Sequence, residues 1–113
     1  MADIRIRKAD GTWTVRAGGA VLAESRNALE LSEDGYPDVI YFPREDVAMA
    51  FLDESDHRTR CEKKGEARYF SIVTKSQTLE NAAWSYEDPI EGMDRIKGHL
   101  AFHPGDLLAV ERV

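Results

Sequence analysis

Closely spaced turn signals constrain the fold of this chain more than any other feature of its sequence. The clearest of them are Asp10-Gly11, Gly18-Gly19, Asp34-Gly35 and Pro104-Gly105. Several of the segments between turn signals alternate apolar with polar residues. Residues 4–7, IRIR, show the pattern typical of a half-buried β-strand. We therefore expect a mainly β domain of roughly eight to ten strands.

Residues 20–31, AVLAESRNALEL, fit two kinds of secondary structure. Leu22, Arg26 and Leu29 have a helical spacing, but the segment directly follows a double-glycine turn. Such a turn after a strand favours a second antiparallel strand. We predict a long strand with a bend near Asn27, so that both of its halves face the core.

Two further parts of the chain carry strong strand signals. Asp10-Gly11 predicts a hairpin that joins residues 4–7 to residues 12–17. Residues 67–73, ARYFSIV, are rich in aromatic and β-branched side chains and form the strongest predicted strand. Residues 79–86, LENAAWSY, are its expected partner across a polar turn.

The remaining segments predict one or two short helical turns and a closing pair of strands. The helical turns are expected at residues 44–49 and 93–96. Residues 99–104 and 107–113 are expected to close the sheet across a turn at Pro104.

Length and charge narrow the classes of partner. With 113 residues, the chain is expected to form one domain over residues 1–113. Its formal net charge of −6 argues against binding to a nucleic-acid polymer, which requires an excess of Lys and Arg. The longest apolar run, VAMAFL, is too short to span a bilayer, so neither a membrane partner nor a signal peptide is expected. A single cysteine cannot form an internal disulfide, which favours a cytoplasmic location.

Cys61 is the only cysteine and the candidate catalytic residue. Lys63 and Lys64 are the kind of neighbours that activate a thiol, and Gly65 allows a ligand to approach the backbone. No local motif ties Cys61 to a histidine base, because the three histidines are scattered along the chain. Cysteines are also commonly small buried side chains without reactivity. Both interpretations of Cys61 stay open.

No metal site and no cofactor are predicted. A structural zinc site takes four ligands, usually from pairs of cysteines, and this chain has a single cysteine. His99 and His103 flank a strand-like segment, where they lie too far apart to chelate one ion easily. The glycine-rich loop and carboxylate cluster required for phosphoryl transfer are also absent from the sequence.

Two pairs of residues spaced two apart indicate where a pocket can lie. Trp84 and Tyr86 project from one face of a predicted strand, either into the core or onto a pocket wall. Glu24 and Arg26 also share a face. If that face points outward they form a surface ion pair, and if it points inward they mark a site.

Four motifs together resemble one family. They are GYPDVIYFPREDV at residues 35–47, RTRCEKKGEARYFSI at 58–72, ENAAWSYEDP at 80–89 and IKGHLAFHP at 96–104. In order and spacing they resemble the DUF427 family of small bacterial and fungal domains of unknown function, sometimes labelled nucleotidyltransferase-like. The resemblance runs from about Val15 to Pro104. Glu62 stands where the family usually has proline, and His103 where it usually has tyrosine.

The resemblance implies a compact fold of two antiparallel sheets, similar to the β-tent or Mss4-like group, with a ligand cleft between them. The zinc of several members of that group is not implied, because this chain lacks their cysteine pairs. The family's recurrent positions correspond to Glu24, Arg26, Tyr41, Pro43, Cys61, Lys64, Gly65, Tyr69, Trp84, Tyr86 and Pro89. Their aromatic rings, two cations, carboxylate and thiol suit a small, flat, partly anionic ligand.

Three functions of different class follow. The favoured one is a small-molecule-binding domain in which Lys64 and Arg26 bind the anionic part of the ligand while Trp84 and Tyr86 stack on its flat part. The predicted ligand-binding residues are Glu24, Arg26, Tyr41, Cys61, Lys64, Tyr69, Trp84 and Tyr86. The alternatives are a thiol-dependent enzyme that uses Cys61, and a module for protein interaction or self-association. The sequence leaves the ligand, any reaction and the oligomeric state open.

Overall fold

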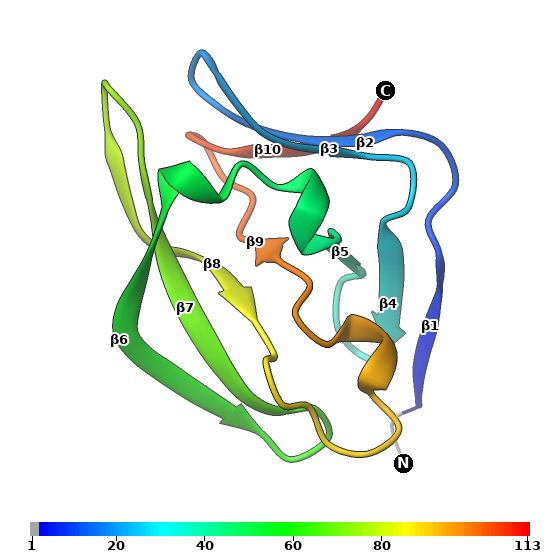
Figure 1. Ribbon diagram of the computed structural model, residues 1–113. Helices are drawn as coiled ribbons and strands as arrows, with labels where there is room; N and C mark the ends of the chain where they lie inside the picture. Colours follow the sequence, from blue (N-terminus) through cyan, green and yellow to red (C-terminus); the bar gives the residue numbers. More distant parts are fainter. Residues whose placement is uncertain (1–2) are drawn as a thin grey trace.

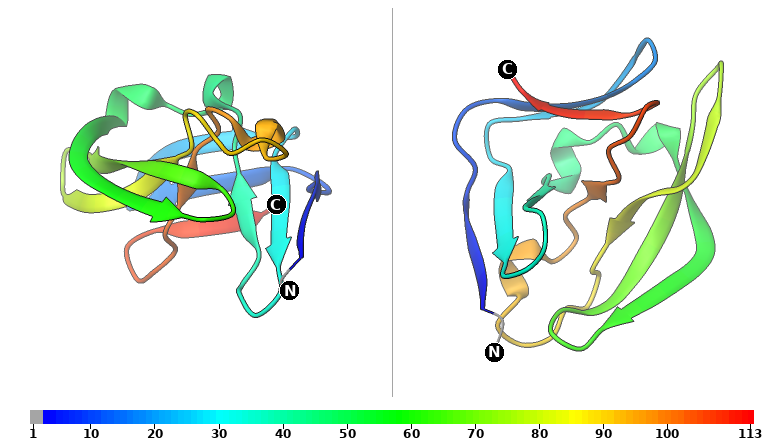
Figure 2. Two further views of the ribbon diagram at one scale, coloured as in Figure 1. Left: turned by 90° about the horizontal axis from the view of Figure 1, so that it is seen from below. Right: turned by 180° about the vertical axis from the view of Figure 1, so that it is seen from behind.

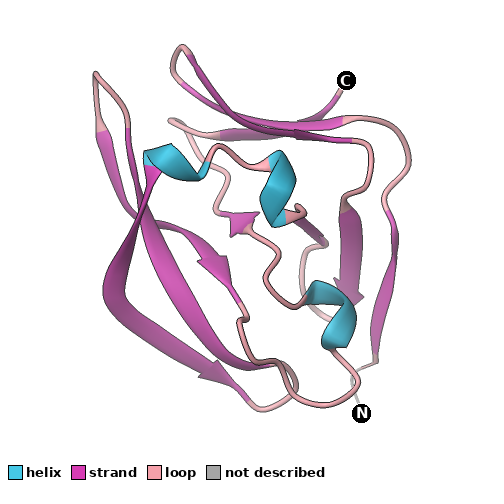
Figure 3. Cartoon of the chain, viewed as in Figure 1, coloured by secondary structure: helices cyan, strands magenta, loops and turns pink. Residues whose placement is uncertain are grey.

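The computed structural model describes residues 3–113, which form ten strands and three short 3-10 turns (Figure 1). The strands are β1 (Ile4–Lys8), β2 (Trp13–Ala17), β3 (Ala20–Ser25), β4 (Leu29–Glu33), β5 (Val39–Tyr41), β6 (Leu52–Cys61), β7 (Gly65–Val73), β8 (Thr78–Ser85), β9 (Ala101–Phe102) and β10 (Ala109–Arg112). The turns are η1 (Arg44–Asp46), η2 (Met49–Phe51) and η3 (Asp94–Ile96). They lie on one side of the molecule (Figures 2 and 3). The predicted mainly β fold is confirmed, with three helical turns in residues 3–113 rather than one or two.

The strands form three antiparallel sheets, whereas two were predicted. Their strand orders are β1-β4-β5, β10-β2-β3 and β6-β7-β8-β9. In Figure 1 the four-stranded sheet lies on the left, the β1-β4-β5 sheet on the right, and the β10-β2-β3 sheet across the top. The chain thus forms a single domain in which the β10-β2-β3 sheet covers one end of the other two sheets.

The β10-β2-β3 sheet is separate from the β1-β4-β5 sheet because the first hairpin bends sharply part-way along its length. We call this bend the corner. Residues 4–17 and 20–33 pair as one long antiparallel hairpin, in which β1 pairs with β4 and β2 pairs with β3. At the corner, the Ala9 amide donates to the Ala28 carbonyl at 2.9 Å, and both alanines are buried. Small side chains at this point let both arms of the hairpin bend together. The choice of strand over helix and the bend near Asn27 are confirmed, but the segment forms two strands, β3 and β4, which belong to different sheets.

The predicted hairpin at Asp10-Gly11 is wrong, because this pair lies at the corner and not at a hairpin tip. Gly11 has a φ of +85°, which glycine adopts without strain, and the chain uses it to pass from one sheet to the next. The actual hairpin tip is Gly18-Gly19, between β2 and β3.

The closing pair of strands is also a wrong prediction. β9 pairs with β8, where Trp84 is opposite Ala101, whereas β10 pairs with β2, where Val15 is opposite Val110. The turn after Pro104 therefore carries the chain from one sheet to another. Sequence alternation identified both strands but contained no information on their partners.

A short bridge joins two of the sheets directly. The amide of Phe42, just after β5, donates to the Leu100 carbonyl at 2.8 Å, and the Leu100 amide donates back at 2.9 Å. Both side chains are fully buried. This bridge sets β5 beside β9 and so brings Tyr41 next to the face of β8.

Alternation along β7 divides the apolar side chains between two clusters. Phe70 and Ile72 belong to the larger core cluster, whereas Ala67 and Tyr69 face a smaller one on the other side of the sheet. The smaller cluster also contains Tyr41 and Tyr86. No helical segment within residues 3–113 is long and apolar enough to cross a bilayer.

Gly65 gives a test of the turn between β6 and β7. Its φ is +116°, and a Cβ there would lie 3.4 Å from backbone atoms of Asp88 and Ile90. We expect Gly65→Ala to lower the free energy of unfolding by about 1–3 kcal/mol, measured by urea denaturation, because L residues are strained at this φ. Gly19→Ala, with no atom within 4 Å of its Cβ, is the control. Equal losses in both variants would contradict this account.

Candidate functional site

A cavity of about 770 Å³ lies beside the smaller apolar cluster. Its walls come from the β4–β5 hairpin, the β6–β7 turn, residues of β7 and on and after β8, the end of β9 with the segment after it, and one residue each of β2 and β10. Among the predicted ligand-binding residues, those in its lining are Tyr41, Cys61, Lys64, Tyr69, Trp84 and Tyr86. Residues from three separate motifs thus surround one space.

Trp84 is the centre of an aromatic cluster on the cavity wall. It lies opposite Tyr69 in the β7–β8 register, with ring centroids 6.4 Å apart. Tyr41 comes from another sheet and meets Trp84 edge-on, at 6.5 Å and 89°. The indole Nε1 donates to the Tyr41 hydroxyl oxygen at 3.3 Å. Edge-on packing is favourable for aromatic pairs, so this contact ties the two sheets together at the cavity.

Glu33 and Lys64 form a mostly buried ion pair at another part of the lining. The Lys64 Nζ lies 2.8 Å from the Glu33 carboxylate, and each side chain is 12% exposed. The same Nζ lies 3.5 Å from the Cys61 Sγ, and the Lys63 Nζ lies 3.7 Å from Glu33. Burial alone lowers the pKa of Lys64, but the hydrogen bond to Glu33 and nearby negative charge outweigh it, and the pKa is raised. Lys64 is therefore an ammonium group already neutralised by Glu33.

Tyr41 and Tyr86 contribute two buried hydroxyl groups. Their side chains belong to residues only 1% and 6% exposed. Burial raises the pKa of Tyr41 to about 12, partly offset by the hydrogen bond from Trp84. Burial also raises the pKa of Tyr86, with the nearby Tyr41 adding to the effect. Both phenols therefore remain protonated at neutral pH.

The raised tyrosine pKa values predict a loss of stability in alkali. A tyrosine in the unfolded chain titrates at pH 10.0, and Tyr41 in the folded chain at about 12. The native state holds the proton longer, so the Tyr41 contribution is complete below pH 10.0 and is lost as the pH rises toward 12. We expect the free energy of unfolding, measured in urea across this range, to fall less steeply in Tyr41→Phe than in the parent. Identical slopes would contradict the prediction.

Two histidines extend the aromatic cluster, although neither was predicted as a site residue. The centre of the His103 ring lies 4.4 Å from that of Trp84 and 6.4 Å from that of Tyr69, on which it is stacked. The His57 ring also contacts Tyr69, with ring centres 4.5 Å apart. His103 follows Ala101 by two residues, and Ala101 is opposite Trp84, so strand alternation could have placed it on this face. Partial burial lowers the pKa of His103.

The lowered pKa of His103 predicts a loss of stability in mild acid. An unfolded histidine titrates at pH 6.5, whereas His103 in the folded chain takes up its proton only at lower pH. The neutral ring therefore contributes fully above pH 6.5, and this contribution is lost as the pH falls below it. We expect the thermal midpoint to fall less with acidification in His103→Gln than in the parent. His99→Gln, outside the cluster, is the control and should behave as the parent does.

The comparison with known families agrees with the motifs. Residues 5–112 match the family described as Domain of unknown function (DUF427). The chain belongs to this family. A comparison with curated proteins gives no match. The resemblance based on four motifs is confirmed, and it covers nearly the whole chain.

In this DUF427 domain, Glu24 and Arg26 lie away from the cavity. Both are exposed, whereas Ala23 and Ser25 point inward, and the Ser25 hydroxyl donates to Asp46 at 2.6 Å. Alternation along β3 turns Glu24 to solvent, and Arg26 is exposed in the bend after this strand. The expected convergence of Arg26 with Lys64 is therefore not found, and Glu33 takes the place beside Lys64.

Sequence reasoning missed Glu33 and Tyr36, which also line the cavity. Glu33 could have been found from alternation, because Leu29, Leu31 and Glu33 share one face of β4 and Leu31 is buried. Tyr36 is 66% exposed on the turn between β4 and β5. Nothing in its local sequence distinguishes a rim residue from any other turn aromatic.

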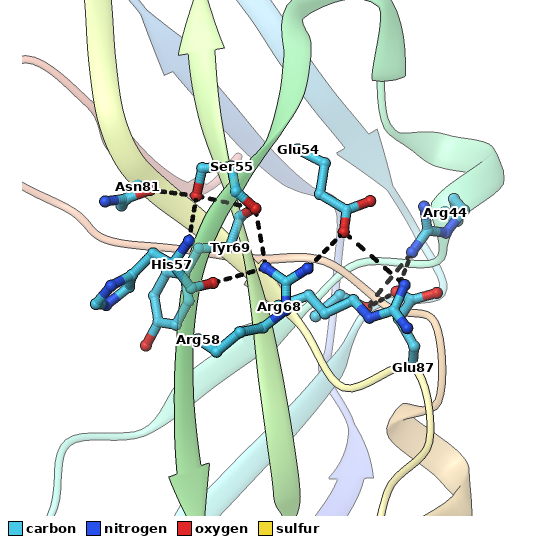
Figure 4. A network of polar contacts seen from close by, with 10 residues as sticks. Arg44, Glu54, Ser55, His57, Arg58, Arg68, Tyr69, Asn81 and Glu87 are labelled. Carbon is cyan, nitrogen blue, oxygen red and sulfur yellow. Dashed lines mark hydrogen bonds and ion pairs between the residues drawn. The ribbon is translucent and has the colours of Figure 1, made fainter.

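A polar network, shown in Figure 4, includes the opposite face of the four-stranded sheet and reaches the backbone of Tyr69 and His57 through Ser55. Arg44 pairs with Glu87, which also accepts a hydrogen bond from Ser85, and the Arg44 guanidinium lies 5.9 Å from the centre of the Phe70 ring. Glu54 lies 3.8 Å from Arg68. These charges satisfy one another, so we assign this network a structural role.

No group of three or more His, Cys, Asp or Glu side chains within residues 3–113 is arranged to hold a metal ion. The expectation that the purified protein carries no stoichiometric zinc stays a prediction, for which elemental analysis is the measurement.

Proposed function

We propose that this DUF427 domain binds a small, flat organic molecule in the cavity beside Trp84. The observation that carries the proposal is the aromatic cluster: Trp84 and Tyr69 are only partly buried, and both line a space of about 770 Å³. Pockets of this volume lined by aromatic rings and a few polar groups are typical of small-molecule sites. The likeness to β-tent domains, whose clefts hold ligands, stays a prediction.

The charges around the cavity do not support the anionic character expected for the ligand. That expectation depended on Lys64 and Arg26 acting together. Arg26 lies elsewhere, and Lys64 is neutralised by Glu33 at 2.8 Å. A second acidic residue of the lining, Glu30, is paired with Arg7 at 2.9 Å. Asp38, also in the lining, is exposed and adds a negative charge, so the cavity favours an uncharged ligand over an anion.

A thiol-dependent reaction is the second candidate. Cys61 lines the cavity, and its Sγ lies 3.5 Å from the Lys64 Nζ. A base such as a histidine next to the thiol would have supported this function more strongly. Within residues 3–113, the hydrogen-bond partner of the thiol is Lys64 alone. We therefore assign Cys61 to the wall of the cavity.

The exposed apolar side chains do not support the alternative of a protein-interaction module. The large apolar side chains with the greatest exposure are Val21, Tyr36, Val73, Leu107 and Val113. They come from separate segments, and docking surfaces need a contiguous apolar patch. A cavity with polar groups directed into it fits a small molecule better.

The test is a fragment screen with flat aromatic compounds, followed by amide NMR spectra. We expect ligands that shift the signals of Tyr69 and Trp84, and Trp84→Leu should weaken their binding about tenfold, because ring stacking is lost. Cys61→Ser should bind nearly as the parent does. Phe51→Leu, which removes a ring outside the cavity lining, is the matched control.

Two results would overturn the proposal. One is a screen in which no flat compound shifts the signals of cavity residues. The other is equal weakening in Trp84→Leu and Phe51→Leu, since that would indicate a general loss of structure. Loss of binding or of an activity in Cys61→Ser alone would favour the thiol-dependent function.

A further inference from the structure

The hydroxyl of Tyr86 belongs to a buried residue and has no partner in the protein. The residue is only 6% exposed, and none of the hydrogen bonds formed by side chains of residues 3–113 involves this hydroxyl. Within the same residues, only the Ser32 hydroxyl is completely enclosed without a partner. The Tyr86 hydroxyl therefore reaches open space, and the open space lined by Tyr86 is the cavity. This hydroxyl is therefore free to hydrogen-bond to a ligand or water in the cavity.

Tyr41 presents a second free donor to the same cavity. Its oxygen accepts the hydrogen bond from the Trp84 indole at 3.3 Å, which leaves its own O–H proton unused within residues 3–113. Burial raises the pKa of both tyrosines, so each keeps its proton and donates. These two phenol O–H groups can both donate to one acceptor atom of a ligand. The flat part of that ligand would lie against the aromatic wall.

The neighbouring charges indicate that this acceptor is uncharged. Lys64 is already paired with Glu33, and Lys63 also lies 3.7 Å from the same carboxylate. A ligand carboxylate placed here would have to share Lys64 and Lys63 with Glu33, so the cost of removing it from water would be only partly offset. An uncharged carbonyl oxygen accepts from both hydroxyls without this cost.

We propose that the Tyr41 and Tyr86 hydroxyls together bind the carbonyl oxygen of an uncharged, flat, conjugated molecule whose ring lies against Trp84. This inference rests on the proposed function and names the chemical class of its ligand. The stacking surface accepts many flat molecules, whereas the two hydroxyls distinguish those that carry a carbonyl group. Tyr86 is thus a specificity-determining residue.

The experiment compares three probes on one ring system: chromone, its methylene counterpart chromene, and chromone carboxylate. Dissociation constants come from amide NMR titrations of the parent, Tyr86→Phe and Tyr41→Phe. The matched control is Tyr36→Phe, which removes a hydroxyl from the exposed rim. Thermal unfolding confirms that each variant is folded, and either of the two buried variants alone is sufficient for the test.

We expect the parent to bind chromone more than about fivefold more tightly than chromene, because each of the two uncharged hydrogen bonds contributes about fivefold. Tyr86→Phe should weaken chromone binding about fivefold and leave chromene binding unchanged, so that the preference is reduced while Tyr41 still donates. Tyr36→Phe should retain the preference. Chromone carboxylate should bind more weakly than chromone.

Three results would overturn the inference, and they differ in what they say of the proposed function. Equal binding of chromone and chromene would refute carbonyl recognition while supporting a site for flat molecules. Tighter binding of the carboxylate would refute the uncharged acceptor. Failure of all three probes to bind would overturn the inference and would also count against the proposed function.

Discussion

The pair of hydrogen bonds between Phe42 and Leu100 is the constraint on which the rest of the site depends. These bonds of 2.8 and 2.9 Å join the β1-β4-β5 sheet to the four-stranded sheet, and both side chains are fully buried. Tyr41 directly precedes Phe42 in the sequence, and Ala101 directly follows Leu100. Ala101 in turn is paired with Trp84. The aromatic cluster is therefore a consequence of where two sheets meet.

Strand alternation gives the two faces of the four-stranded sheet different roles. On β7, Phe70 faces the main core while Tyr69 faces the cavity. On and beyond β8, Trp84 and Tyr86 face the cavity, whereas Ser85 between them faces the Arg44–Glu87 network. A single pleated pair of strands thus supports a closed core on one side and a partly open aromatic surface on the other.

The sequence predicted the strands well but their partners poorly, and the reason is physical. Alternation records which residues share a face, and it located the bent hairpin arm around Asn27 and the shared face of Trp84 and Tyr86. It does not record which edges pair, so the corner at Gly11 was taken for a hairpin tip. The same limit applies to Arg26: the shared face with Glu24 was predicted, but its direction depends on tertiary packing. Within the site, the family resemblance supplied most of the residues, whereas Glu33 was missed although alternation places it on the face of Leu31.

The Glu33–Lys64 pair decides what kind of selectivity this cavity can have. Glu33 lies on β4 and Lys64 on the β6–β7 turn, so the pair is a second link between the two sheets that Phe42 and Leu100 join. A lysine held this way has lost most of its value as a free cation, because its charge is already balanced in a mostly buried environment. Charge that serves to join the sheets is not available to attract a ligand. Apart from the exposed Asp38, the polar groups of the lining include hydroxyls and ring faces, and these recognise the position of an acceptor atom and the shape of a flat molecule more than its net charge.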